Sequence, residues 1–242
     1  QSFIIIACPI KNKLMSYRKL RNDEIRILES QGCSCKNWDL VEVTEEFTPG
    51  RVRESSFSGT IKMGRFLKLF ELAGGVLKKA GIRNVALHNV EIGDDCYIEN
   101  VHNYIANYKI GAECFIENVD IIVTEGFSKF GNGICANVLN ETGGREVYIN
   151  DKLSAHLAYF SALYRHRPKL AKKLHALSTF YANKHGSEYG TIGEGCKIIN
   201  TGKISAVKIG NNCTIQGSSL LENGSINSTA EDPVFIGRAV SA

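Results

Sequence analysis

A repeat of 18 residues limits the fold of this chain more than any other feature of its sequence. The segment IGDDCYIENV, which begins at Ile92, aligns with IGAECFIENV, which begins at Ile110, and seven of the ten positions are identical. Shorter copies begin at Ile192 and Ile209, 17 residues apart. A fixed period of this length indicates a solenoid, because a single unit buries its apolar side chains only by stacking on its neighbours.

Within each copy an apolar residue recurs every six positions, and glycine, asparagine or aspartate follows closely. The series in the best-preserved part is Ile92, Ile98, Tyr104, Ile110, Ile116 and Ile122. This period differs from the roughly 3.6 residues of a helix and the roughly two of a strand. We therefore expect three short strands per coil, each ended by a tight turn that glycine, asparagine and aspartate adopt at little cost. Inward side chains should stack on their counterparts one coil away, at about 4.8 Å.

These residues resemble the hexapeptide-repeat family of acyltransferases, whose motif is an aliphatic residue, glycine and four more residues. The resemblance covers about residues 51–150 and 188–240 and implies an all-β solenoid, the left-handed parallel β-helix. The runs YRKLRNDEIRILESQGC and HNYIANYKIG are more closely similar to a large bacterial hexapeptide-transferase-like family of unassigned function. The resemblance also implies a homotrimer, with sites in grooves between neighbouring subunits.

Two segments interrupt the repeat and carry helical patterns. In residues 22–32 an asparagine suited to cap a helix is followed by acidic residues and finally by glycine, which predicts a short helix. It would belong to an N-terminal cap of residues 15–50 that covers the open end of the coils. In residues 151–187 two apolar series at helical spacing flank Pro168, which predicts an inserted helical hairpin. The side chains expected to face inward are Leu153, Leu157, Phe160, Leu170, Leu174 and Leu177.

The remaining residues complete the division of the chain. Residues 1–14 lack the basic region and the cleavage site of a signal peptide, and we interpret them as a non-native or upstream leader. Coils of residues 51–150 precede the hairpin and coils of residues 188–242 follow it. Because the patterned sequence continues almost to Ala242, we expect a truncated C-terminus. No apolar run reaches the roughly 18 residues that span a bilayer.

Cysteine usage indicates a reducing compartment. Four of the eight cysteines occupy the same repeat position, Ile-Gly-x-x-Cys, and are expected to be small buried side chains rather than disulfide partners. They are Cys96, Cys114, Cys196 and Cys213. Cys33 and Cys35 form a single C-x-C without a second cysteine pair or histidines at the spacing of a zinc site. The sequence therefore predicts a cytoplasmic protein without a metal site.

Two histidines in the coils, His88 and His102, have chemistry suited to acyl transfer. The resembled family commonly uses a histidine as the general base that deprotonates a hydroxyl or amine for attack on a thioester, since imidazole exchanges protons near neutral pH. The spacing of His88 to the following Ile-Gly pair is similar to that of the base histidine in lipid A acyltransferases. The structural alternatives are a surface histidine at position 88 and a turn histidine bonded to the backbone at position 102.

Polar residues near these histidines are the candidate substrate-binding groups. Asn103 and Asn107 stand close to His102 in a segment that could line a groove between coils. Farther along, residues 137–147 surround a Gly-Gly pair with polar groups suited to a hydroxylated or anionic ligand, or form a solvated crossover into the hairpin. The candidates in that segment are Asn140, Glu141 and Arg145.

Positive charge is concentrated on the predicted hairpin. Residues 151–187 hold seven Lys and Arg against one Asp, a net charge of +6 that leaves −2 for the rest of the chain. A basic helical surface attracts phosphates, acidic carrier proteins, nucleic acid or anionic lipid, and a solvated helix face is the neutral alternative. Nucleic acid is the weakest of these partners, because the rest of the chain is slightly acidic and has no nucleic-acid-binding motif.

The resemblance implies a transferase that moves an acyl group, such as acetyl, from a thioester to a sugar or nucleotide-sugar, without a tightly bound cofactor. The donor would be coenzyme A or an acyl carrier protein, and the acidic carrier would dock on the basic hairpin. A non-catalytic β-helix that binds a sugar nucleotide or a partner protein is the alternative. A γ-type carbonic anhydrase needs three zinc-binding histidines in adjacent coils, which His88 and His102 do not supply. Dinucleotide, P-loop and serine-hydrolase motifs are absent from the sequence.

Overall fold

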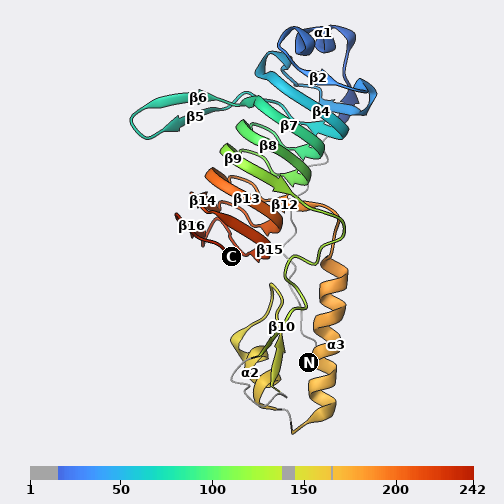
Figure 1. The fold of residues 1–242 in the computed structure, drawn as a ribbon, viewed down its shortest axis with the longest axis vertical. Coiled ribbons are helices and arrows are strands. Elements are labelled where there is room, and N and C mark those ends of the chain that lie inside the picture. Colours follow the sequence, from blue (N-terminus) through green and yellow to red (C-terminus); the bar gives the residue numbers. More distant parts are fainter. Residues whose placement is uncertain (1–15, 138–144, 165) are drawn as a thin grey trace.

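A computed structural model describes residues 16–137, 145–164 and 166–242. The described chain is mostly β, with 12 strands in one sheet whose long neighbours run parallel and three α-helices outside that sheet. The strands stack into a column with the N-terminal cap at one end and the C-terminal strands toward the other (Figure 1). Two projections leave this column, a two-stranded arm near the cap and a larger insert near the opposite end.

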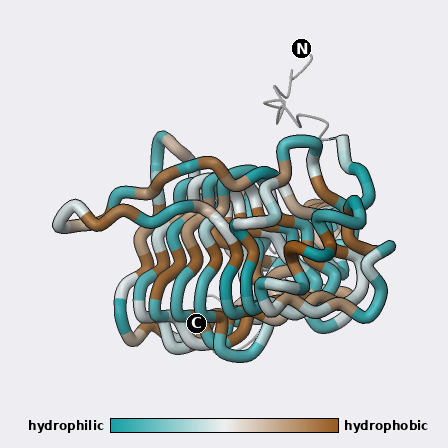
Figure 2. The backbone as a smooth tube through the Cα atoms, turned by 90° about the horizontal axis from the view of Figure 1, so that it is seen from above, coloured by the Kyte–Doolittle hydropathy of each residue, from teal (hydrophilic) through white to brown (hydrophobic). Residues whose placement is uncertain are grey.

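The column follows the register that the repeat predicts. Its long strands are β4 (Val52–Met63), β7 (Gly81–Ile92), β8 (Tyr97–Ile110), β9 (Phe115–Val123) and β13 (Lys197–Ile209). Its short strands are β12 (Gly190–Ile192), β14 (Thr214–Gln216), β15 (Leu220–Ile226) and β16 (Phe235–Ile236). Tyr97 pairs with Phe115 and Ile98 with Ile116, so sheet neighbours are the residues that the repeat aligns. Figure 2 shows the coils side by side, with their hydrophobic positions in line.

The core is a stack of aliphatic side chains that paired strands place above one another. Ile82, Ile98, Ile116, Ile198 and Ile215 occupy successive paired positions, and all five are fully buried. Burial of such a side chain contributes about 1.5–3 kcal/mol, so coil stacking supplies much of the stability. The prediction for the repeat cysteines is confirmed, because Cys96, Cys114, Cys196 and Cys213 are buried and free.

Asparagines turn the chain at one edge of the column. Asn84, Asn100, Asn118 and Asn200 have positive φ angles between 50° and 54°, a region that asparagine tolerates better than most residues. The Nδ2 atom of Asn84 donates to Oδ1 of Asn100, and Asn118 donates likewise to Asn200, each at 3.1 Å. These turns explain the asparagine in the repeated Ile-x-Asn-Val motif.

The N-terminal cap covers one end of the column (Figure 1). It comprises β1 (Tyr17–Lys19), α1 (Asn22–Ser30), β2 (Ser34–Cys35), β3 (Val41–Thr44) and 3-10 helices at Trp38–Leu40 and Pro49–Arg51. The helix predicted from residues 22–32 is confirmed as α1, but its N-cap residue is Arg21 rather than Asn22, and Glu24 accepts from the backbone N–H of Arg21. The guanidinium of Arg18 donates two hydrogen bonds, of 2.7 and 2.8 Å, to the buried carboxylate of Glu24, and it lowers the pKa of that carboxyl group.

The arm is the antiparallel pair of β5 (Leu69–Leu72) and β6 (Val76–Lys79). Near the column, the ring of Phe70 packs edge-on against that of Phe115, with 5.4 Å between centroids. Lys78 of the arm forms ion pairs with Glu99 and Glu117 of the column. The arm is therefore attached to the column by an aromatic contact and by ion pairs.

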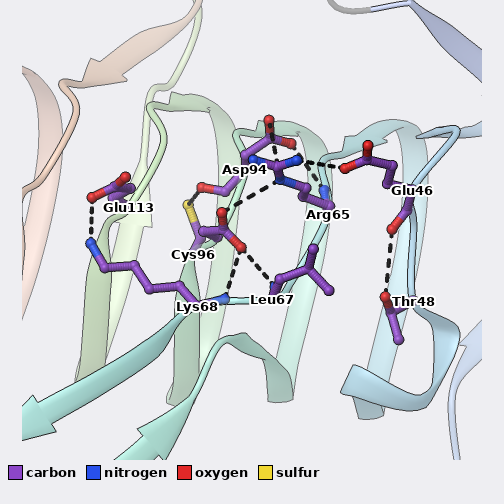
Figure 3. Close-up of polar contacts among 9 residues, drawn as sticks. Glu46, Thr48, Arg65, Leu67, Lys68, Asp94, Cys96 and Glu113 are labelled. Carbon is purple, nitrogen blue, oxygen red and sulfur yellow. Dashed lines mark hydrogen bonds and ion pairs between the residues drawn. The ribbon is translucent and has the colours of Figure 1, made fainter.

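The two aspartates of the motif Ile-Gly-Asp-Asp-Cys accept hydrogen bonds from the backbone at the base of the arm. Figure 3 shows Asp94 beside Arg65. Asp94 Oδ1 accepts a hydrogen bond from the backbone N–H of Arg65 at 3.0 Å. Asp95 Oδ1 accepts from the N–H groups of Leu67 and Lys68 at 2.7 and 2.9 Å. Where the chain leaves the column, the backbone N–H groups no longer have a neighbouring strand to bond to. The two carboxylates accept these hydrogen bonds instead.

The insert comprises β10 (Cys135–Asn137), β11 (Glu146–Tyr148), α2 (Ala155–Leu163) and α3 (Pro168–His185). It extends away from the column, with α3 reaching back toward it (Figure 1). The two helices confirm the predicted hairpin. The antiparallel β10–β11 pair lies in a region expected to form coils, so the interruption begins after β9 rather than at Asp151.

The predicted inward packing of the hairpin leucines is wrong. Leu153 and Leu174 are half-buried, whereas Leu157, Phe160, Leu170 and Leu177 are exposed. The reason is that α3 faces β11 rather than the column, and His175 contacts the ring of Tyr148 with 3.9 Å between centroids. None of the described helices is long and apolar enough to cross a membrane.

Candidate functional site

His88 and His102 lie on neighbouring strands of the column, β7 and β8, and both are exposed. The parallel register places His88 between Ser58 of β4 and Ala106 of β8. His88 therefore stands in a row of residues that crosses three coils. This row is the centre of the candidate site.

Amide hydrogen bonds orient Asn89, the neighbour of His88. Its Oδ1 atom accepts from the backbone N–H of Thr60 at 3.0 Å, so its Nδ2 atom is the donor on the other side. This nitrogen lies 3.2 Å from Oδ1 of Asn107 and 3.1 Å from Nε2 of His88. Asn107 in turn donates to the carbonyl of Thr124 at 2.8 Å.

The same contacts assign the tautomer of His88. Because the Asn89 amide donates toward Nε2, that atom carries the imidazole lone pair and the ring proton resides on Nδ1. The Nδ1–H group then donates to Oγ of Ser58, at 2.8 Å, and the Ser58 hydroxyl donates to the carbonyl of Leu87 at 3.3 Å. His88 thus has a basic nitrogen on one side and an orienting partner on the other, which is the arrangement of a general base.

Ser58 and Asn89 are functional candidates that the sequence did not reveal. Ser58 precedes His88 by 30 residues, because the arm separates their coils and breaks the 18-residue offset. Gly59 is the local signal of the contact, since a Cβ atom there would lie 2.1 Å from Oδ1 of Asn89. Its φ of +64° also favours glycine.

His102 and Asn103 lie at a bulge in β8. Between the positions that pair with Arg83 and Leu87 of β7, β8 contains two more residues than β7 does. The extra length moves both side chains outward, and Asn103 Nδ2 donates to Oδ1 of Asp120 at 2.6 Å. His102 and Asn103, which are consecutive in the sequence, therefore both point out from this bulge.

The bulge forms one edge of a surface groove. Residues from the cap, β4, β7 and β8 line it, including Gly32, Ser34, Ser55, Ser56, Asn84 and His102. Five of the eleven lining residues offer hydroxyl or amide groups, which can bond to the hydroxyls of a carbohydrate. This groove and the His88 row lie on the same adjacent strands, β4, β7 and β8.

The other predicted binding residues are divided between two places. Asn107 belongs to the hydrogen-bond chain of His88 rather than to the groove at His102. Arg145 directly precedes β11 and so belongs to the insert. Figure 1 shows the insert extending away from the part of the column that contains β7 and β8. Asn140 and Glu141 lie outside the described residues. Within the described ranges, no three His, Cys, Asp or Glu side chains gather as a metal site would require.

Comparisons with known proteins place the chain in a family. Residues 17–242 match the family described as Domain of unknown function (DUF4954). Over 236 residues the chain is 27% identical to an uncharacterized protein of Treponema pallidum (strain Nichols). The match covers 93% of this chain and 32% of that protein, so the chain spans about a third of the length of this relative. No solved structure gives a significant match.

Proposed function

The chain belongs to the DUF4954 family, and we propose that its column is a left-handed parallel β-helix that transfers an acyl group from a thioester to a sugar or nucleotide-sugar. The observation that carries the proposal is the orientation of exposed His88, whose Nε2 lone pair accepts from the Asn89 amide while Nδ1–H is held by Ser58. Such a histidine is prepared to take a proton from an acceptor hydroxyl or amine. Acyl transfer to such an acceptor requires a base of this kind.

In the proposed reaction, the acceptor replaces the Asn89 amide as the group that donates to Nε2 of His88. The acceptor oxygen or nitrogen attacks the thioester carbonyl as Nε2 takes its proton, and the carbon–sulfur bond then breaks. The imidazolium returns the proton to the departing thiolate, while Ser58 continues to accept from Nδ1–H. General-base catalysis of this kind contributes about 10² to 10⁴ in rate.

The donor in this proposal is coenzyme A or an acyl carrier protein, and no cofactor is held tightly. The groove at His102 and Asn103 would bind the hydroxyl groups of the acceptor. We also propose that the chain acts in a reducing cytoplasm and forms a homotrimer. The row at His88 is exposed, which leaves room for a neighbouring subunit to close the site. Size-exclusion chromatography with light scattering measures that oligomeric state directly.

The test is release of free thiol from acetyl coenzyme A and from acyl carrier protein thioesters, in the presence of a panel of nucleotide-sugars. Turnover with at least one acceptor, confirmed by the mass of an acylated product, is the expected result. Thioester cleavage without an acylated sugar would assign hydrolysis instead. Absence of turnover and of donor binding by calorimetry would overturn the proposal.

A second candidate function is non-catalytic binding of a sugar nucleotide or a partner protein. It is favoured by the polar lining of the groove at His102 and by the fact that Asn89 already occupies Nε2 of His88. Calorimetry distinguishes the two candidates. Binding of a nucleotide-sugar without binding of any thioester donor would assign the chain to this second function.

A further inference from the structure

The insert exposes an unusual amount of apolar surface on both of its helices. Seven large side chains are between 37 and 65% exposed, namely Leu157, Tyr159, Phe160, Leu163, Leu170, Leu177 and Phe180. The insert is also the element that extends farthest from the column (Figure 1). Apolar surface of this extent on a projecting element is typical of an interaction site.

On α3 the exposed side chains form one stripe. Leu170, Leu177 and Phe180 follow one another at i, i+7 and i+10, which places them on one side of the helix. Lys173 and Lys184 fall on the same side, at i+3 and i+14. The opposite side of α3 faces β11, and its residues Leu174, His175 and Ser178 line a cavity between the two elements. We call this exposed side, Leu170 to Lys184, the α3 stripe.

Aromatic rings gather at the end of the insert that lies away from the column. Phe160 and Tyr164 contact each other with 5.0 Å between ring centroids, and Tyr159 lies 6.0 Å from Phe160. The ring of His166 lies 5.4 Å from that of Tyr164. Tyrosine and phenylalanine with basic neighbours are the composition of side chains that reside at a membrane–water interface.

The charge of the same helices has one sign. α3 carries four lysines and neither aspartate nor glutamate, and α2 contains no Lys, Arg, Asp or Glu. Lysines near an anionic bilayer surface contribute attraction that falls off within a Debye length. Their methylene stems can also lie along an apolar surface while the ammonium stays in water.

From these observations we infer that the insert binds the surface of an anionic lipid bilayer through the α3 stripe. A second copy of the chain is a poorer occupant, because two insert surfaces of net charge +6 repel. An acidic protein would match the charge, but lysine is depleted at the centres of protein interfaces and here stands among the apolar side chains. A bilayer accommodates both, with leucine and phenylalanine among the acyl chains and lysine at the phosphates.

Flotation of the full chain with vesicles tests this inference. The chain is expected to float with vesicles of phosphatidylcholine and phosphatidylglycerol, to float poorly with pure phosphatidylcholine, and to be released by high salt. The double variant L177D/F180D should lower partitioning by about 100-fold, and K173E/K184E by about tenfold. Both variants change exposed side chains, so melting temperatures should match that of the parent chain.

The arm supplies a matched control. Leu69 and Leu77 are 48 and 58% exposed, comparable to the α3 stripe, and the double variant L69D/L77D should float as the parent does. Loss of flotation in L69D/L77D equal to that in L177D/F180D, or no flotation of the parent, would overturn the inference. An oligomer that dissociates in L177D/F180D without vesicle binding would assign the stripe to a second copy. Binding of an acidic carrier protein, lost in that variant and again without vesicle binding, would assign it to a protein partner.

Discussion

The hydroxyl of Tyr108 forms two hydrogen bonds with the backbone of Val207, donating to its carbonyl and accepting from its N–H, each at 3.0 Å. The two residues are 99 positions apart, on β8 and β13, and the whole insert lies between them in sequence. Tyr108 is fully buried, and a Cβ atom on Gly190 would lie 2.3 Å from its ring. Tyr108 therefore fastens together the coils that precede and follow the insert.

Removal of this hydroxyl should weaken the column. In Tyr108→Phe, the N–H and carbonyl of Val207 lose a buried partner, and we expect the free energy of unfolding to fall by about 1–3 kcal/mol. Chemical denaturation followed by circular dichroism measures the change. Tyr104→Phe, at an exposed position, should alter stability by less than about 0.5 kcal/mol, and equal effects of the two variants would contradict the role of Tyr108.

The same side chain should give the column a stability that depends on alkaline pH. Burial raises the pKa of Tyr108 to about 12, above the value of about 10 for an exposed tyrosine. The contribution of neutral Tyr108 to the free energy of unfolding is complete below pH 10. It falls by about 3 kcal/mol in total as the pH rises from 10 toward 12. Parent and Tyr108→Phe should therefore converge in unfolding free energy over this interval. A constant difference between them would show that Tyr108 titrates like an exposed tyrosine.

The asparagine turns offer a test of backbone conformation. Asn100 has a φ of 54°, so Asn100→Ala should cost about 1–2 kcal/mol, because alanine adopts this region reluctantly. Asn100→Gly should recover most of that loss although it also lacks the amide. Thermal melting of the two variants measures the difference. Asn103→Ala, at a residue outside this region of φ, serves as the control. If Asn100→Gly were as unstable as Asn100→Ala, the loss would be due to the hydrogen bond between the Asn84 and Asn100 side chains instead.

The repeat made the column predictable because it specifies which residues are neighbours. Ile98 and Ile116 share a position in the motif, so their pairing and burial follow from the 18-residue offset alone. Ser58 and His88 share no such position, because the arm separates their coils by an additional loop. The sequence alone therefore made His88 a candidate base, whereas Ser58, which orients it, could be found only from the structure.

The insert shows a different limit of prediction. Helical spacing predicted two amphipathic helices and located both, but α2 (AHLAYFSAL) is apolar on nearly every side. In α3, amphipathicity indicates a face without indicating what covers it. In the structure Leu174 lines a cavity with β11, whereas Leu170 and Leu177 are exposed. The strands of the β10–β11 pair have only three residues each, so the sequence gives little sign of them. Tertiary contacts of this kind are absent from a local pattern.

Reactivity of the cysteines should separate the column from the insert. Burial raises the pKa of the Cys213 thiol to about 12, so little thiolate forms at neutral pH. Cys135 is exposed and should react with iodoacetamide about 100-fold faster than the four repeat cysteines in the folded chain. Peptide mapping by mass spectrometry assigns each site. Equal rates across these five positions in the absence of denaturant would contradict the burial of the coil thiols.

Substitution by aspartate should affect the stability of the insert at one leucine of α3 and not at another. Leu174 is half-buried and lines a cavity with β11, and Leu174→Asp should destabilise the insert by about 1–3 kcal/mol. Leu177 is 59% exposed, and Leu177→Asp should change stability by less than about 0.5 kcal/mol. Hydrogen exchange of the α3 amides, compared with those of β8, reports the effect locally. Faster exchange throughout α3 in both variants would mean that Leu177 is covered in solution.

The last prediction concerns the proposed base. His88→Ala should lower turnover by about 10² to 10⁴ with little change in melting temperature, because the side chain is exposed. Ser58→Ala should lower turnover less, by about tenfold, since Nδ1–H loses its partner while Nε2 remains, and Ser58→Thr should restore it. His102→Ala should raise KM for the acceptor with kcat unchanged, because it lines the groove. A rate that survives His88→Ala within threefold would move the role to His102, and survival of both alanine variants would exclude histidine as the base.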